Sequence, residues 1–216
     1  MWFQQALFVF PLIAMSRTAP YCGGRSALIF LQGLASDSSL SPVLSFTRNV
    51  VRSRTSSIDH AGGVVEWFKG PKNQMQDDLD EALEKIEKEE IEYLIYEEGI
   101  CPEDIVVAGM SQGGALTIWM ALFSKYKLGG FIPMNIYSSE WLQLEDLQIP
   151  EKPVNQWTPI LHLNGKIDDQ TKKFDATGKA FIENIFTNYE FRHVTIFNAL
   201  VKDGMDYIQT IQCQVN

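Results

Sequence analysis

The chain has 216 residues, a formal net charge of −9 and a sequence pI near 4.8, and 45% of its residues are hydrophobic. This length suits one large domain with a buried core. The apolar fraction is too high for a disordered chain. The acidic balance argues against a general nucleic-acid-binding protein, because binding to phosphates needs an excess of lysine and arginine.

The chain begins with a strongly apolar segment, residues 1–15, whose aromatic side chains are Trp2, Phe3, Phe8 and Phe10. It lacks the basic start of a secretory signal. Pro11 interrupts it, and it is too short to span a bilayer. We therefore predict an apolar arm over residues 1–25, a domain over 26–216 and no transmembrane segment. The arm is interpreted either as an extra strand or hairpin on the core, or as a segment buried in a protein partner.

Three cysteines, Cys22, Cys101 and Cys213, are scattered along the chain. Their spacing fits no zinc site, and their odd number excludes a disulfide framework that uses all three. We therefore expect reduced thiols in an intracellular, cytoplasmic protein, with an organelle as the alternative compartment. The sequence contains no recognisable metal site or phosphate-binding loop, so no metal and no cofactor are predicted.

The first predicted strand is Ser26–Gly33, a short apolar run that ends in glycine. Residues 35–62 are rich in serine, threonine and arginine and predict mostly loop, with a weak strand candidate at Val50 and Val51.

The clearest helix covers residues 75–98, and Gly99 is well placed to end it. Its apolar stripe recurs at helical spacing and consists of Leu79, Leu83, Ile86, Ile91 and Leu94. The same segment holds eleven acidic residues and two lysines, so it accounts for the net charge of the whole chain. We interpret its acidic side as a solvated outer face. In an assembly subunit it would be the natural contact for a basic partner surface.

Strands and helices alternate through the rest of the chain. The predicted strands are 105–108, 130–134, 159–163 and 191–197, and the predicted helices are 113–126 and 177–187. Such alternation implies right-handed crossovers and a mainly parallel sheet, which is an α/β fold.

The motif with chemical content is Gly109-Met110-Ser111-Gln112-Gly113, which follows a predicted strand and opens a predicted helix. This is the setting of a G-x-S-x-G nucleophile elbow, a tight turn that lifts the serine hydroxyl above the sheet edge. The helix N-terminus then offers free N–H groups and a positive dipole end to a developing oxyanion. The alternative interpretation is a glycine-rich turn kept for close packing.

These residues carry a resemblance to a known family. Residues 105–122 resemble the elbow of the acyl-protein thioesterases, in the phospholipase/carboxylesterase branch of the α/β-hydrolases, which typically reads G-F-S-Q-G-G-A. Residues 28–34 resemble the family's L-I-F-L-H-G-L loop, 57–68 a stretch that ends in S-W-F-D, and 158–168 the motif T-P-I-L-x-x-H-G-D-x-D. The resemblance covers roughly residues 26–200 and implies a mainly parallel sheet flanked by helices.

The resemblance implies hydrolysis of acyl esters or thioesters by a Ser–His–Asp triad without a cofactor. By position, Ser111 would be the nucleophile and Asp168 would orient the histidine. The backbone N–H groups of Leu34 and Gln112 would form the oxyanion hole.

The sequence departs from the family at the triad histidine. The loop after the last strand, residues 198–205, contains no histidine, and Lys202 stands at or near the expected position. The three histidines of the chain fall elsewhere: His60 in the serine-rich loop, His162 inside a predicted buried strand and His193 at the start of the last strand. We interpret all three as surface or core residues without a catalytic role.

The missing histidine decides the functional hypotheses. A serine hydroxyl without a base is a poor nucleophile, and loss of a triad member costs on the order of 10⁴–10⁶ in rate. We therefore expect a hydrolase fold whose ester or thioester hydrolysis is impaired or lost. The alternatives are a catalytically inactive structural or interaction subunit, an enzyme that uses Lys202 as its base, and an acyl-chain-binding module without turnover.

Overall fold

The computed structural model describes residues 25–33, 50–54, 58–59, 65–68, 72–136, 149–165 and 179–194. The strands are β1 (Ala27–Leu31), β2 (Val50–Arg54), β3 (Ile58–Asp59), β4 (Val65–Glu66), β5 (Ile105–Met110), β6 (Gly130–Met134), β7 (Ile160–Gly165) and β8 (Tyr189–Val194). The helices are α2 (Lys72–Ile86), α3 (Glu92–Tyr96), α4 (Gln112–Phe123) and a segment over residues 179–185. A π-helical turn (Glu87–Ile91) joins α2 to α3, and a 3₁₀ turn (Pro102–Asp104) precedes β5.

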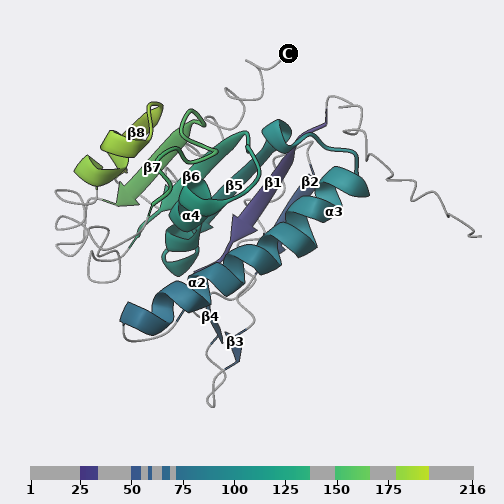
Figure 1. Ribbon diagram of the computed structural model, residues 1–216, viewed down its shortest axis with the longest axis horizontal. Coiled ribbons are helices and arrows are strands. Elements are labelled where there is room, and N and C mark those ends of the chain that lie inside the picture. Colours follow the sequence, from purple (N-terminus) through teal and green to yellow (C-terminus); the bar gives the residue numbers. More distant parts are fainter. Residues whose placement is uncertain are drawn as a thin grey trace, which may run out of the picture.

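Six of the strands form one sheet in the order β2-β1-β5-β6-β7-β8, and every pair in it is parallel (Figure 1). A separate antiparallel pair joins β3 to β4. All residues of β1 and β6 are buried, as expected for parallel strands covered on both faces. The predicted α/β architecture is therefore confirmed.

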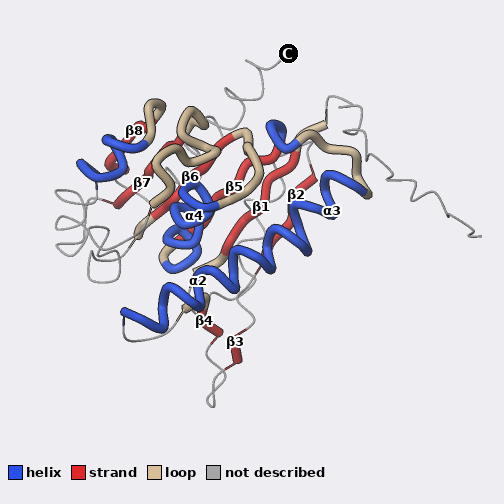
Figure 2. The backbone as a smooth tube through the Cα atoms, in the orientation of Figure 1, coloured by secondary structure: helices blue, strands red, loops and turns tan. Residues whose placement is uncertain are grey.

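The two faces of the sheet belong to two separate apolar clusters, because side chains alternate along each strand. One cluster joins Ile29, Val107 and Phe131 of the sheet to apolar residues of the helices. The other consists of strand residues on the opposite face, with Phe30 and Ile132 among them. The helices α2, α3 and α4 and the segment 179–185 lie on the first face (Figure 2).

The predicted helix over residues 75–98 is confirmed, and it ends at glycine as expected. Gly99 has a φ of +66°, and the N–H of the next residue, Ile100, donates to the Leu94 carbonyl at 2.9 Å. The π-helical turn between α2 and α3 had no counterpart in the sequence pattern. Such a turn adds a residue to the helical repeat and changes which residues share a face.

The interpretation of a solvated acidic face is correct for the exposed acids and wrong for Glu87 and Glu90. These two side chains are buried, at 5% and 0% exposure, on the same side of the π-helical turn as Ile91. The Glu87 carboxylate accepts hydrogen bonds from the Ser124 hydroxyl at 2.7 Å and from the Lys125 N–H at 3.0 Å. Since Ser124 caps the C-terminus of α4, Glu87 stabilises the end of that helix.

The region predicted as loop contains a full strand. β2 pairs with β1 along its whole length, from Val50 opposite Ala27 to Arg54 opposite Leu31. The sequence signal was weak because the polar residues of β2 have low strand propensity. Pairing with an already buried neighbour overrides that propensity.

Cys101 is disulfide-bonded, so the expectation of three reduced cysteines is wrong. The odd number of cysteines excludes only a framework that uses all of them. Whether a single disulfide forms depends on which two cysteines the fold brings within bonding distance. Cys22, Cys213 and the arm with its aromatic residues lie outside the described residues. In the part of the chain that the structure describes, no helix has the length and apolar character required to cross a membrane.

We predict that Glu87→Ala lowers the free energy of unfolding by about 1–3 kcal/mol, because it leaves the buried Ser124 hydroxyl and the Lys125 N–H without their acceptor. Urea denaturation measures the change. The matched control is Glu84→Ala, an exposed acid on the same long helix, which should change stability by no more than about 0.5 kcal/mol. Equal losses in the two variants would contradict the assigned role.

Candidate active site

Ser111 occupies a strained turn between β5 and α4. Its backbone has φ 55° and ψ −119°, a conformation that non-glycine residues rarely adopt. The Ser111 N–H donates to the Met134 carbonyl at 2.9 Å, and its carbonyl accepts from the Ala115 N–H at 3.1 Å. These bonds fix the turn to the neighbouring strand β6 and to the first turn of α4.

Glycines make this turn possible. A Cβ on Gly109 would lie 2.2 Å from the Gly113 carbonyl oxygen, and one on Gly113 would lie 2.2 Å from the Leu31 carbonyl oxygen. Close packing therefore explains the glycines, as the alternative interpretation of the motif proposed. It does not explain a serine at a positive φ, where glycine would be less strained, and such strain is concentrated at functional positions.

The turn after β1 lies directly against Ser111. A Cβ on Gly33 would be 3.1 Å from the Ser111 Cβ and 3.1 Å from the Met110 carbonyl oxygen. Gln112 is the first residue of α4, so its N–H belongs to the helix N-terminus. The structure thus brings together the two chain segments that were predicted to supply oxyanion donors. Leu34 itself lies outside the described residues.

His193 does not reach Ser111, although it lies closer than predicted to the edge of the sheet where the parallel strands have their carboxyl ends. β8 starts at Tyr189, earlier than expected, so His193 is the fifth described residue of the strand rather than its start. Strand register places Met110, Met134, Leu163 and Arg192 at one level across the sheet. Three strand spacings still separate β8 from β5, about 14 Å at the usual distance between strands.

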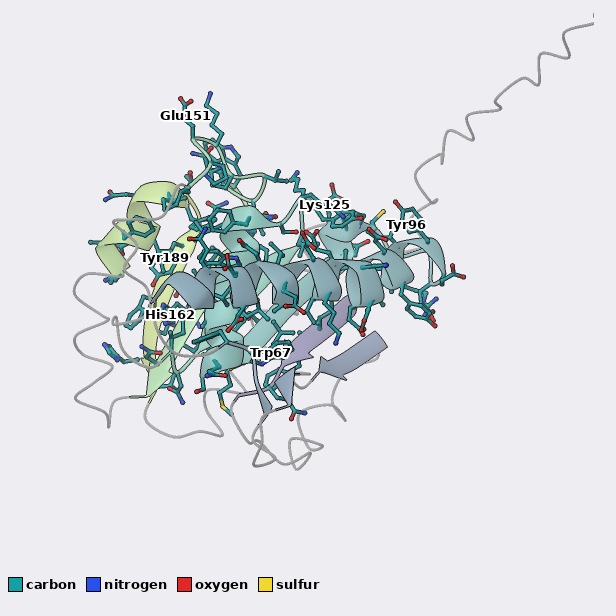
Figure 3. The ribbon with its side chains drawn as sticks, turned by 60° about the horizontal axis from the view of Figure 1, so that its bottom comes forward. Trp67, Tyr96, Lys125, Glu151, His162 and Tyr189 are labelled. Atoms are coloured by element: carbon teal, nitrogen blue, oxygen red, sulfur yellow. The ribbon has the colours of Figure 1, made fainter. Side chains whose placement is uncertain are left out.

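His162 is a core residue, as predicted. Its ring is fully buried, and Nδ1 lies 2.8 Å from the Tyr189 hydroxyl (Figure 3). Burial is the main cause that lowers the pKa of His162 to about 3, and nearby His193 acts in the same direction. The hydrogen bond with Asn164 opposes this shift. His162 is therefore neutral at physiological pH.

The remaining predicted site residues, Asp168 and Lys202, lie outside the described residues, as does His60. Within the described ranges, no group of three or more histidine, cysteine, aspartate or glutamate residues could hold a metal ion.

Sequence reasoning missed one residue at the site, Trp67, whose backbone N–H bonds to Gln112 of the elbow and whose indole N–H bonds to Gln32 after β1. The only feature of the sequence that could have pointed to Trp67 as a site residue is its place in the stretch 57–68, which resembles the family motif.

The sequence matches the model of the phospholipase/carboxylesterase family over residues 53–212. The chain belongs to this family. A strained serine at a strand–helix turn, against the turn after β1, is the arrangement expected of an α/β-hydrolase.

Curated relatives of this family member include acyl-protein thioesterase 1 of Kluyveromyces lactis, 35% identical over 99 residues, which are 44% of this chain and 42% of the relative. Acyl-protein thioesterase 1 of Saccharomyces cerevisiae is 30% identical over 114 residues, 51% of this chain and 47% of the relative. The matched parts thus span less than half the length of these relatives.

Solved structures of similar fold include SOBER1 of Arabidopsis thaliana, with a TM-score of 0.65 and 20% identity over 87% of this chain and 99% of that one. The carboxylesterase of Bacillus cereus has a TM-score of 0.68 and 13% identity over 90% and 92% of the two chains. These likenesses, together with the family match, confirm the predicted α/β-hydrolase fold.

We predict that Gly113→Ala prevents stable folding, because the new methyl group would collide with the backbone of β1 rather than with a movable side chain. The comparison variant is Gly99→Ala. That position is strained by its φ of +66° but has nothing within 4 Å of a Cβ, so it should lose only about 1–2 kcal/mol. Circular dichroism and thermal unfolding of both variants decide the point, and a well-folded Gly113→Ala variant would refute the assigned packing.

We predict that His162 makes stability fall with decreasing pH. Its pKa is about 3 in the folded chain, against an ordinary value of 6.5, so below pH 6.5 the unfolded chain binds the proton first. This contribution is complete above pH 6.5 and decreases by roughly one kcal/mol per pH unit as the pH falls toward 3. Denaturant titrations of wild type and His162→Gln between pH 7 and 4 measure it. The variant should show the shallower slope, and parallel slopes would contradict the assignment.

Proposed function

We propose that this chain is a serine hydrolase of the acyl-protein thioesterase and carboxylesterase type whose turnover of acyl esters or thioesters is impaired or lost. The observation that supports the proposal is the strained backbone of Ser111 at the N-terminus of α4. A positive φ at a non-glycine residue costs on the order of 1–3 kcal/mol. The relatives named acyl-protein thioesterase 1 suggest the substrate class.

In the proposed acylation step the Ser111 oxygen attacks the acyl carbonyl carbon, and the bond to the leaving alcohol or thiol breaks. The serine proton passes through a base to the leaving group. Water then hydrolyses the acyl-serine and restores the hydroxyl. The N–H groups of Leu34 and Gln112 would stabilise the negative charge of the tetrahedral intermediate, as the family resemblance implies.

The proposed impairment rests on the sequence of residues 198–205, which holds no histidine where the family resemblance places one. The two histidines that the structure describes cannot act on Ser111, because His162 is buried in the β7–β8 core and His193 is about 14 Å away across the sheet. In the family pattern Asp168 would orient a histidine. Lys202 stands at or near the position of that histidine in this chain. A lysine would have to be neutral to accept the serine proton, and lysine is ordinarily charged.

The alternative of an interaction subunit stays a prediction, as does the intracellular location. The arm that would contact a partner lies outside the described residues. The acidic helix directs Glu87 and Glu90 into this chain's own core and leaves Asp77, Glu81, Glu84, Glu89 and Glu97 exposed to solvent.

The proposal is tested with a fluorophosphonate probe, which labels activated serines, together with hydrolysis of a p-nitrophenyl ester and an acyl thioester. Saccharomyces cerevisiae acyl-protein thioesterase 1, measured in parallel, provides the reference. We expect slow labelling of wild type that Ser111→Ala abolishes, and turnover lower than the reference by about 10⁴–10⁶.

Turnover close to that of the reference would contradict impairment, and labelling that persists in Ser111→Ala would contradict the assigned nucleophile. The variant Lys202→His asks whether the histidine alone is missing. We expect it to restore only part of the activity, because other positions near the site, such as Gln32, also depart from the family pattern. Full recovery in this variant would show that the loss lies in one residue.

A further inference from the structure

We infer that Trp67 is a positioning residue that holds both sides of the oxyanion hole in place around Ser111. The inference rests on the proposed function, because it assigns a role in the same site. Trp67 follows the short strand β4 and is 5% exposed. Figure 3 shows it beside β1, below the long helix.

The first contact of Trp67 is with the turn after β1. Its indole Nε1–H donates to the Gln32 carbonyl oxygen at 2.6 Å. Gln32 follows the last residue of β1, and Gly33 after it packs against Ser111. A bond to the Gln32 carbonyl therefore fixes the peptide that leads into Gly33 and Leu34, where the first oxyanion donor is expected.

The second contact of Trp67 is with the first residue of α4. Its backbone N–H donates to the Gln112 side-chain oxygen Oε1 at 3.0 Å. The Gln112 side-chain nitrogen donates in turn to the Phe68 carbonyl at 3.4 Å. The Gln112 side chain is thereby tied to residues 67–68, while its backbone N–H belongs to the N-terminus of α4, where no intrahelical acceptor is available.

One residue thus connects the two segments that supply the proposed donors. Oxyanion stabilisation depends on donors that are already in place, because removal of one donor costs about 10²–10³ in rate. A shift of 1 Å caused by a remote mutation can cost about 10². The Trp67 bonds restrain both segments, although Trp67 itself donates nothing to the reacting atoms.

Trp119 offers a matched control for loss of buried volume. Its side chain is 2% exposed, and its Nε1–H donates to the Asp80 carboxylate at 2.9 Å. Trp119 lies eight residues along α4 from Ser111, about 12 Å at the usual helical rise. Trp67→Phe and Trp119→Phe therefore each remove one hydrogen bond of a buried indole. The Trp67 bond lies at the site, and the Trp119 bond lies far from it.

The experiment compares wild type, Trp67→Phe and Trp119→Phe at matched fractions of folded protein. The measurements are the rate of Ser111 labelling by a fluorophosphonate and amide hydrogen exchange of the peptides around residues 31–34 and 111–113. We expect Trp67→Phe to label at least about tenfold more slowly and to exchange faster around residues 31–34, the segment that the indole bond restrains. Trp119→Phe should match wild type in both measurements. Should Trp67→Phe fail to fold, Gln112→Met takes its place, because it removes the other connection, the hydrogen bonds between the Gln112 side chain and residues 67–68.

Equal labelling rates and equal exchange in the two tryptophan variants would overturn the inference and leave the proposed function intact. Absence of Ser111-dependent labelling in wild type would overturn the proposed function instead. Hydrogen exchange then decides the positioning role by itself. Faster exchange around residues 31–34 in Trp67→Phe alone supports the role, and unchanged exchange refutes it.

Discussion

The close approach of α4 to β1 is the constraint on which the site depends. Gly113 lies so near the Leu31 carbonyl that no side chain fits between them. This contact brings the N-terminus of α4 over the carboxyl end of β5, forces the sharp turn at Ser111 and places the turn after β1 against the serine. A larger residue at position 113 would separate the helix from the sheet and the serine from its proposed donors.

Residues from outside α4 hold both of its ends. At the N-terminus, Gln112 bonds to residues 67 and 68, and Trp67 continues the connection to Gln32. At the C-terminus, Glu87 accepts from Ser124 and Lys125. A helix so anchored keeps a strained residue at its first turn, because relaxation of Ser111 would have to break contacts with several elements.

The family match and the local geometry agree on the hydrolase fold, whereas neither described histidine is placed to act as the base for Ser111. The described histidines take structural places: His162 pairs with the Tyr189 hydroxyl inside the sheet's apolar layer, and His193 lies on the far edge strand. The strained turn at Ser111, together with a sequence that has no histidine in residues 198–205, is the reason why we propose a hydrolase with poor turnover rather than full activity.

The sequence by itself determined the alternation of strands and helices from residue 75 onward, the elbow at Ser111, the helix end at Gly99 and the core position of His162. Each of these depends on local pattern, such as apolar periodicity or a glycine at a tight turn. Only the tertiary structure decided that β2 is a strand, that Glu87 and Glu90 are buried, that Cys101 is paired and that Trp67 joins the two sides of the site. These features depend on contacts between residues that are distant in sequence, and no local pattern records such contacts.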